Sequence, residues 1–426
     1  MRGRVNLPAE SGRPDASTMN SGKTSLTKML LHVRDDPSVR RAFFVFSLTR
    51  VLLLAVFIIG GQVDRVSRGS TDTVRDLSLS LGKIPVSRVL QRTISTADVN
   101  WYYSVAHDGY ERIPFNADRP HNWAFFPLFP MLWRLAARVT GEYPISGLLI
   151  SHLFFFLGLI FTHKAAQAFG FGKVLADRGL FYLAVFPTSY FYSLPLTESL
   201  FLFLSAASIY SAKQGRWWMA GLAGGLASLT RVTGVLIFPA LLVLYWETYG
   251  GNLRSKAAWR SALFHKEFLS LFLVPAGIGA FMFYLFAITG NPLAFKDILV
   301  SWGRGIGFFP VTLFGYLRNP WLIAVPWDFR LVNFTGAALA LICGAWLIKH
   351  RQWALGLYTL LCVIAALSSL LLQSQARYAM VLFPIYFVLA KAGNRPHVDE
   401  AIRTVSIALF TLMTALFLTH FSLAMS

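Results

Sequence analysis

Residues 267–289 read EFLSLFLVPAGIGAFMFYLFAIT, and this stretch decides the class of fold. An apolar run of about 20 residues is long enough to cross a lipid bilayer as a helix. The whole chain of 426 residues has the same character, with 55% hydrophobic and only 14% charged residues, against about 25% charged in a typical soluble domain. The mean hydropathy is +0.53. We therefore predict a polytopic membrane protein, and we exclude an ordinary soluble enzyme, a disordered protein and a fibrous repeat.

Ten further runs qualify, or nearly qualify, as membrane spans, and together with 267–289 they predict an all-α, polytopic transmembrane helix bundle of about 11 spans. These runs are 42–61, 144–169, 178–194, 196–212, 216–230, 232–248, 332–349, 352–372, 377–391 and 402–421. The first begins too far from the N-terminus for a signal peptide, so we expect it to be a permanent span. The shorter run 123–139 is broken by prolines, which predicts a re-entrant or interfacial segment.

The charge pattern predicts the orientation. Lys and Arg gather in every second connection and in the polar segment 1–41, which we expect to be a disordered, basic, cytoplasmic tail. This bias explains the net charge of +19, so nucleic acid is not an expected partner. The remainder, 42–426, is then one transmembrane domain with two long extracytoplasmic loops, 62–143 and 290–331. Loops of this length are usually functional or disordered.

The first of these loops contains a candidate catalytic carboxylate. Residues 97–110 read ADVNWYYSVAHDGY, which predicts a short helix beginning after Asp98. A carboxylate among Trp101 and Tyr102 at the membrane edge is a candidate general base. The alternative is that Asp98 only caps the helix and Asp108 is only solvated. His121 lies in a second polar and aromatic segment, HNWAFFPLFP, which either lines a site or anchors the interface.

Three charged residues interrupt apolar segments on the predicted outer side. Glu198 begins a span in PLTESLF, Arg231 separates two runs in LTRVTG, and Arg377 precedes Tyr378 in QSQARY. An acid in this position is costly unless it is paired or hydrated, or it serves the helix dipole. A guanidinium suits a phosphate group, and the alternative is a snorkelling or ion-paired arginine. The two cysteines lie far from ligand-type neighbours, so we expect no metal and no cofactor.

Taken in order, these motifs resemble the PIG-V-type (GPI mannosyltransferase 2-like) family of membrane mannosyltransferases. The resemblance covers roughly residues 40–392. Its motifs are D98xxWYxxxAxxGY110, FFPLFP at 125–130, TESLF at 197–201, WWxAG at 217–221 with TRxTG at 230–234, and RY at 377–378 followed by FP at 383–384. The family usually has Trp just before the motif's Asp, where this chain has Ala97.

The resemblance implies a GT-C glycosyltransferase architecture and transfer of a sugar, typically mannose, from a polyprenyl-phosphate sugar on the non-cytoplasmic face. The acceptor would be a lipid or a glycan. The resemblance assigns catalysis to Asp98, which we interpret as the base of an inverting attack. The predicted substrate-binding residues are Asp108, Trp101, Tyr102, His121, Glu198, Arg231, Arg377 and Tyr378.

Three alternatives remain open at this stage: a transporter or flippase of lipid-linked sugars, an enzyme of the same architecture that uses another sugar, and an inactive partner subunit. The notable charges gather at the outer ends of spans rather than at mid-span, which favours an enzyme. The compact loops and basic tail suggest a bacterial plasma membrane, with the endoplasmic reticulum as the eukaryotic counterpart.

Overall fold

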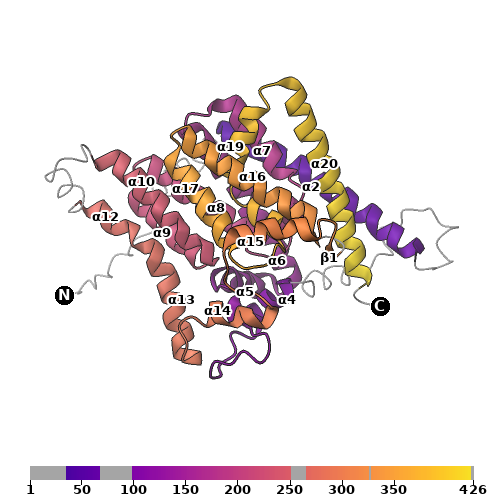
Figure 1. The fold of residues 1–426 in the computed structure, drawn as a ribbon, viewed down its shortest axis with the longest axis vertical. Coiled ribbons are helices and arrows are strands. Elements are labelled where there is room, and N and C mark those ends of the chain that lie inside the picture. Colours follow the sequence, from indigo (N-terminus) through magenta and orange to yellow (C-terminus); the bar gives the residue numbers. More distant parts are fainter. Residues whose placement is uncertain (1–34, 68–97, 251–264, 326–327, 424–426) are drawn as a thin grey trace, which may run out of the picture.

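The computed structural model describes residues 35–67, 98–250, 265–325 and 328–423, which are mainly helical (Figure 1). The α-helices are α2 (Pro37–Ser67), α4 (Asp98–His107), α5 (Leu128–Thr140), α6 (Tyr143–Ala168), α7 (Gly172–Ala184), α8 (Glu198–Lys213), α9 (Trp217–Ser228), α10 (Ile237–Tyr249), α12 (Lys266–Leu271), α13 (Leu273–Thr289), α14 (Ala294–Asp297), α15 (Phe309–Phe314), α16 (Arg330–Lys349), α17 (Trp353–Leu367), α18 (Gln375–Met380), α19 (Pro384–Ala392) and α20 (Pro396–Leu423). The 3₁₀ helices are η3 (Asn122–Ala124), η4 (Ser189–Ser193), η5 (Val232–Leu236), η6 (Ile298–Trp302) and η7 (Gly315–Arg318). Strands β1 (Ile323–Val325) and β2 (Asp328–Phe329) form one small antiparallel pair. The predicted helical class is confirmed.

Every predicted apolar run coincides with helix, although some runs are not continuous. Within the described residues, six segments are long and apolar enough to cross a membrane: Pro37–Ile59, Tyr143–Ala168, Val232–Tyr249, Lys266–Thr289, Arg330–Lys349 and Pro396–Leu418. Helices α8, α9 and α17 are shorter, and the runs 178–194 and 377–391 are each broken near a proline, Pro187 or Pro384. Proline disfavours a helical residue before it and donates no hydrogen bond. The chain is an integral membrane protein, and the count of eleven spans stays a prediction.

The first helix is longer than its apolar run. Helix α2 begins at Pro37, inside the predicted tail, and ends at Ser67, inside the predicted first loop. The hydropathy of residues 42–61 located the apolar part of this helix. It did not detect the polar turns at either end, which can extend beyond the hydrocarbon region of a bilayer. The expected disorder of residues 1–34 falls outside the described residues, as do residues 68–97 of the loop.

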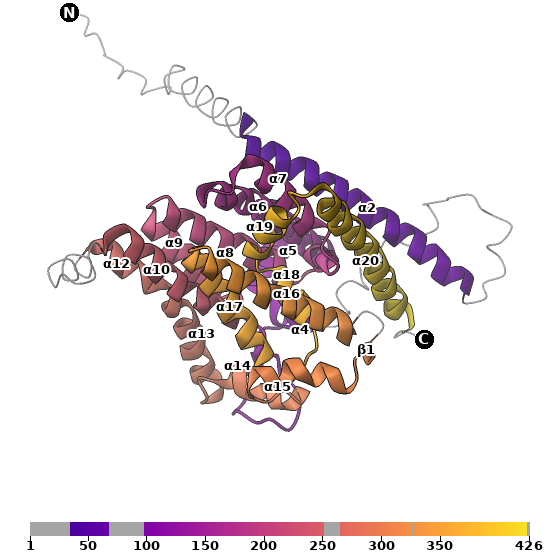
Figure 2. The same ribbon diagram turned by 45° about the horizontal axis from the view of Figure 1, so that its top comes forward.

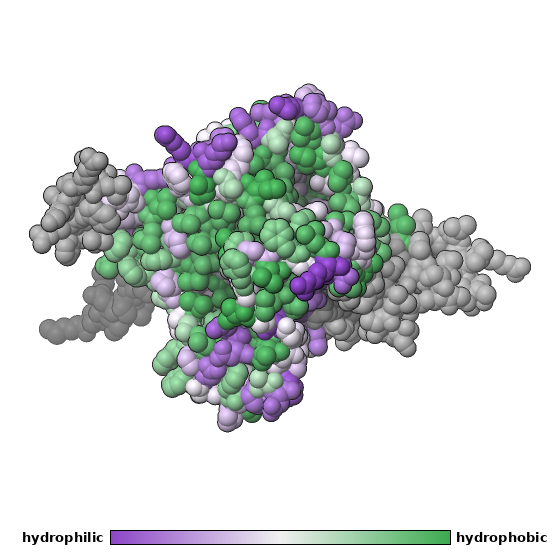
Figure 3. Space-filling view, in the orientation of Figure 1, coloured by the Kyte–Doolittle hydropathy of each residue, from purple (hydrophilic) through white to green (hydrophobic). Residues whose placement is uncertain are grey.

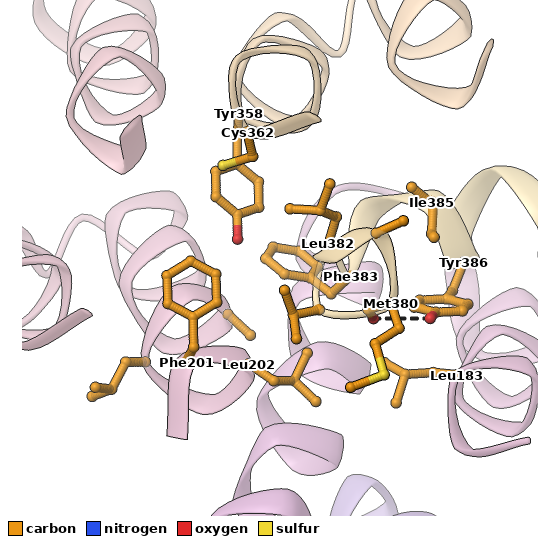
Figure 4. Packing of buried hydrophobic residues seen from close by; sticks show 14 of the residues in the cluster. Leu183, Phe201, Leu202, Tyr358, Cys362, Met380, Leu382, Phe383, Ile385 and Tyr386 are labelled. Carbon is orange, nitrogen blue, oxygen red and sulfur yellow. Dashed lines mark hydrogen bonds between the residues drawn. The ribbon is translucent and has the colours of Figure 1, made fainter. Parts of the chain in front are cut away.

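A core of large side chains joins α7, α8, α17 and the α18–α19 region (Figure 4). Phe201 of α8 and Tyr358 of α17 are fully buried in this core. The Tyr386 hydroxyl donates to the Met380 carbonyl oxygen at 2.8 Å and ties the start of α19 to the end of α18. The core therefore holds the first turn of α8 and the short helix α18 in fixed positions.

Close helix packing fixes α9. The small residues Gly221 and Gly225 lie against the α12–α13 region. A Cβ atom at Gly221 would lie 2.0 Å from the Ser270 carbonyl oxygen, and one at Gly225 would lie 2.5 Å from that of Leu273. The backbones approach too closely for any larger residue, so both glycines serve helix packing.

The surface separates into an apolar band and two polar ends. Figure 3 shows hydrophobic side chains across the middle of one face, with hydrophilic ones gathered at the top and at the bottom. In the same orientation, α7 and α19 lie toward the top and α4, α5 and α14 toward the bottom (Figure 1). Figure 2 shows α2 and α20 side by side along one flank. A band of this kind suits a bilayer, and the elements of the two predicted outer loops share one polar end.

Candidate active site

Helix α4 holds the candidate base and is anchored at its far end. It begins at Asp98, and its buried residues include Val99, Tyr102 and Ala106, which recur at helical spacing on one face. Arg134 of α5 donates from Nε to the Ala106 carbonyl oxygen at 2.5 Å and from Nη2 to that of His107 at 3.2 Å. A cation thus satisfies carbonyls that a helix end leaves without partners. The short helix predicted for this segment is confirmed.

A chain of ion pairs begins at Asp98. Its Oδ2 lies 2.5 Å from Nη1 of Arg377, which comes from α18. Nε of Arg377 lies 2.6 Å from Oε1 of Glu198, and the same oxygen lies 3.0 Å from Nη1 of Arg231. Four residues that are far apart in the sequence therefore meet, and they link the first loop to the ends of α8, α9 and α18.

Glu198 and Arg377 are the buried members of this series of ion pairs, and burial strongly constrains how they can be paired. The Glu198 side chain is 0% exposed and that of Arg377 is 7% exposed, whereas Asp98 is 47% exposed. A buried carboxylate is tolerated when it is paired and hydrogen-bonded. Arg377 also lies over the Phe191 ring at 4.6 Å, and Arg231 lies over the Tyr378 ring at 5.2 Å. The alternative considered for both arginines, an ion-paired guanidinium, describes this geometry.

The turn that carries Arg231 depends on a glycine. Arg231 has extended backbone and precedes η5, which folds back on the end of α9. A Cβ atom at Gly234 would lie 2.3 Å from the backbone of Ala227, so the chain can turn here only with glycine. The TRxTG motif thus supplies a cation and the tight turn that directs it toward Glu198.

A cavity of about 330 Å³ opens beside the ion pairs, a size typical of small-molecule sites. Of the predicted site residues, Asp98, Tyr102, Arg231, Arg377 and Tyr378 line it. Segments from both predicted outer loops, from α17 and the residues just after it, and from the chain next to α8, α9 and α18 complete the wall with Ala124, Phe125, Phe126, Thr197, Thr230, Val232, Thr233, Phe295, Lys296, Leu299, Trp302, Arg304, Cys362, Ala365, Ala366, Ser369, Val381 and Leu382. The cavity lies where the two predicted outer loops meet.

Aromatic rings form the side of the cavity next to α4. Trp101 stacks on Phe125 with centroids 5.6 Å apart and meets Trp302 edge-on at 5.6 Å. Tyr102 meets Phe125 edge-on at 5.0 Å. Burial of the Tyr102 phenol raises its pKa to about 12, so it stays neutral beside the charges. Trp101 therefore supports the wall from behind, and Tyr102 forms part of it.

Two predicted site residues lie elsewhere. Asp108 follows α4, opposite the end that holds Asp98, and its exposed side chain contacts the ring of His107. His121 is fully buried, bonded to Glu111 at 2.5 Å and to Asn116 at 3.0 Å. Neither residue lines the cavity. Asp108 is close to Asp98 in the sequence, but the length of helix α4 separates the two carboxylates.

Sequence reasoning missed two cations. Lys296 of α14 and Arg304 line the cavity from the second predicted outer loop, and neither is ion-paired with a carboxylate within the described ranges. Arg304 Nη1 donates to the Tyr378 hydroxyl at 3.4 Å. No sequence signal singled them out, because cations are common in both predicted outer loops.

The arrangement of helices is that of a GT-C membrane glycosyltransferase. The crystal structure of ArnT from Cupriavidus metallidurans bound to undecaprenyl phosphate resembles it with a TM-score of 0.50 and 12% identity, over 79% of this chain and 76% of that chain. The structure of the archaeal oligosaccharyltransferase AglB from Archaeoglobus fulgidus, in complex with an inhibitory peptide and a dolichol-phosphate, gives a TM-score of 0.39 and 13% identity. That match covers 79% of this chain and 55% of that chain.

The chain belongs to the PIG-V mannosyltransferase family of membrane glycosyltransferases, whose model, Mannosyltransferase (PIG-V), matches residues 40–305. The family predicted from the motifs is confirmed. The mouse (Mus musculus) protein GPI alpha-1,6-mannosyltransferase 2 is 25% identical over 235 residues, which are 50% of this chain and 45% of that protein. The chain thus matches less than half the length of this relative.

Proposed function

We propose that this protein transfers mannose from a polyprenyl-phosphate mannose to a hydroxyl group of a lipid or glycan acceptor, on the extracytoplasmic face and with inversion. The observation that carries the proposal is the position of Asp98 in the cavity wall, half exposed and beside a group of cations, in a chain of a mannosyltransferase family. Asp98 Oδ2 is paired with Arg377, and the exposed part of the carboxylate is available to the hydroxyl group of an acceptor.

In the proposed reaction, the Asp98 carboxylate takes the proton of the acceptor hydroxyl. The acceptor oxygen forms a bond to the anomeric carbon from the side opposite the phosphate. The bond from that carbon to the phosphate oxygen breaks, and the polyprenyl phosphate leaves with the electron pair. Asp98 is left protonated, and the configuration at the anomeric carbon is inverted.

The donor phosphate needs cations, and the four in the cavity wall differ. Arg231 and Arg377 were the sequence-based candidates, and both contact carboxylates. Lys296 and Arg304 have no carboxylate partner among the described residues. We therefore assign the direct phosphate contacts to Lys296 and Arg304, and we assign to Arg231 and Arg377 the task of fixing Asp98 and Glu198 in place. A donor phosphate bound where the two outer loops meet could contact these cations while the polyprenyl tail of the donor remains in the bilayer.

A transfer assay with purified protein tests the proposal. Polyprenyl-phosphate mannose with a labelled sugar is supplied with membrane lipid extract, and we expect label in a new lipid or glycan product. Asp98→Asn should remove this activity, since a positioned general base contributes about 10²–10⁴-fold, and Glu247→Asn, at an exposed position away from the cavity, should retain it. Near-normal turnover by Asp98→Asn would reject the assigned base.

The same assay addresses the alternatives. A panel of other polyprenyl-phosphate sugars identifies an enzyme with a different donor. A flippase would move the labelled donor across a vesicle membrane without forming any new product, and an inactive partner subunit would do neither.

A further inference from the structure

A buried polar pair lies next to the turn that carries Arg377, outside the cavity wall. Asp328 belongs to β2 and Asn333 to the first turns of α16, and their exposed fractions are 4% and 3%. The Asn333 side-chain amide donates to Oδ1 of Asp328. Buried polar side chains are costly unless they are bonded, so the position of such a pair is informative.

Both members of the pair hold the backbone just before Arg377. The Ser374 amide donates to Asp328 Oδ1 at 3.4 Å, and the Ala376 amide donates to Asn333 Oδ1 at 3.1 Å. Ser374 has φ +61°, a left-handed conformation that non-glycine residues seldom adopt. Such a conformation persists where surrounding contacts over-determine it.

Other contacts close the remaining sides of this turn. Thr188 Oγ1 donates to the Ala376 carbonyl oxygen at 3.3 Å, and the Gln375 side chain donates to the Ala366 carbonyl oxygen at 3.1 Å. A Cβ atom at Gly336 would lie 2.7 Å from Ala376 Cα, so α16 presses directly on the turn. The segment 374–376 is therefore fixed by α16, α17, β2 and the residues before η4.

We propose that Asp328 and Asn333 are positioning residues for catalysis, which act by fixing the turn that aims Arg377 at Asp98 and Glu198. The inference rests on the proposed function. Arg377 must meet two carboxylates at once, at 2.5 and 2.6 Å, and a planar guanidinium meets such partners only over a narrow range of directions. The second outer loop and the start of α16 thereby control the orientation of a base in the first loop.

The hydrogen bonds, rather than the charge of Asp328, carry this role, and this distinction allows a test. Asp328→Asn keeps an acceptor oxygen for Asn333 and Ser374, whereas Asp328→Leu and Asn333→Leu remove the bonds at similar volume. We expect Asp328→Asn to retain kcat within about 3-fold, and each Leu variant to lose about 10–100-fold in kcat with little change in donor KM, since misplacement of about 1 Å can cost 10²-fold.

A double-mutant cycle with Arg377→Lys separates positioning from general damage. In that background N333L should cost less than about 2-fold further, because the side chain it positions is already altered. Asn291 is a control with a similar pattern of bonds: it donates to Asp297 Oδ2 at 2.9 Å and accepts from the Leu293 amide at 2.8 Å, in the loop that also contains Asp328. Asn291→Ala should have the same fold-effect in both backgrounds.

The outcomes are distinguishable. An equal loss for N333L with and without Arg377→Lys, or an Asp328→Asn variant as impaired as Asp328→Leu, would overturn the positioning role. If N333L does not yield folded protein by size-exclusion chromatography, Asn333→Ser, which adds no apolar group, takes its place in the cycle. Turnover of the wild type tests the proposed function separately, since only the ratios to wild type bear on Asp328 and Asn333.

Discussion

The substitution Glu198→Gln tests whether one buried oxygen holds the site together. Glutamine keeps the shape of the side chain and an acceptor for Arg231 and Arg377, and it removes the negative charge between them. Glu198 is 0% exposed and lies 2.6 and 3.0 Å from the two guanidinium groups. Two guanidinium groups, 7% and 15% exposed, would then share a neutral partner in place of a buried carboxylate.

The size of the effect follows from burial. Loss of one partner from a buried ion pair costs about 3–5 kcal/mol. Asp98→Asn breaks a contact of similar length, but its carboxylate is 47% exposed, and pairs open to water are worth about 0–1 kcal/mol. At about 2 °C per kcal/mol for a large domain, Glu198→Gln should lower the unfolding temperature by on the order of 5–10 °C and Asp98→Asn by about 2 °C or less.

Thermal unfolding of protein in lipid nanodiscs measures this difference. The chain has 12 tryptophans, so intrinsic fluorescence reports unfolding without a label. A single scan rate is needed because unfolding of such proteins is often irreversible. Glu247→Gln, at an exposed position, is the control and should change the midpoint very little. Equal midpoints for Glu198→Gln and the wild type, or equal shifts for Glu198→Gln and Asp98→Asn, would refute the reasoning.

Three further expectations concern the donor, the first loop and the sidedness of the membrane. Lys296→Ala and Arg304→Ala should each raise the donor KM. The unfolding temperature should stay the same, because neither cation is ion-paired in the described structure. An unchanged donor KM in the double variant would contradict the assignment of both cations to the donor phosphate. Arg134→Ala should lower stability by about 1–3 kcal/mol, since the carbonyls at the end of α4 lose a charged donor, and a thermal midpoint equal to wild type would argue against this anchor. In a cysteine-free background, Asp108→Cys should react with a membrane-impermeant reagent added outside intact cells, and labelling only after permeabilisation would reverse the proposed orientation.

Hydropathy predicted where the helices lie because it reports burial in lipid, and this signal is local in sequence. Hydropathy did not report whether the helix is continuous along each apolar run. The runs 178–194 and 377–391 are each mainly apolar along their length, yet the helix is interrupted near Pro187 and before Pro384. These prolines were visible in the sequence, and giving them more weight would have located both breaks.

The site was predictable in part, for a different reason. Asp98 stood out because it lies among aromatic residues, and Glu198, Arg231 and Arg377 stood out because they interrupt apolar segments. Their mutual pairing was not predictable, because Arg377 meets Asp98 and Glu198 across separations of 279 and 179 residues. Lys296 and Arg304 drew no attention because a cation in a polar loop costs nothing by itself. Only the fold brings them to the cavity wall.

The distribution of charge around the cavity fits the course of the proposed reaction. A donor phosphate diester carries one negative charge, and the departing polyprenyl phosphate gains a second as the bond to the sugar breaks. Cations stabilise that change most when they are not already neutralised. Arg231 and Arg377 share Glu198, and Arg377 also holds Asp98, so their charges are largely met before any substrate arrives. Lys296 and Arg304 lack such partners in the part of the chain that is described, and they line the same cavity. The paired arginines are therefore suited to fix the base, and the two unpaired cations are suited to receive the charge that develops on the leaving group.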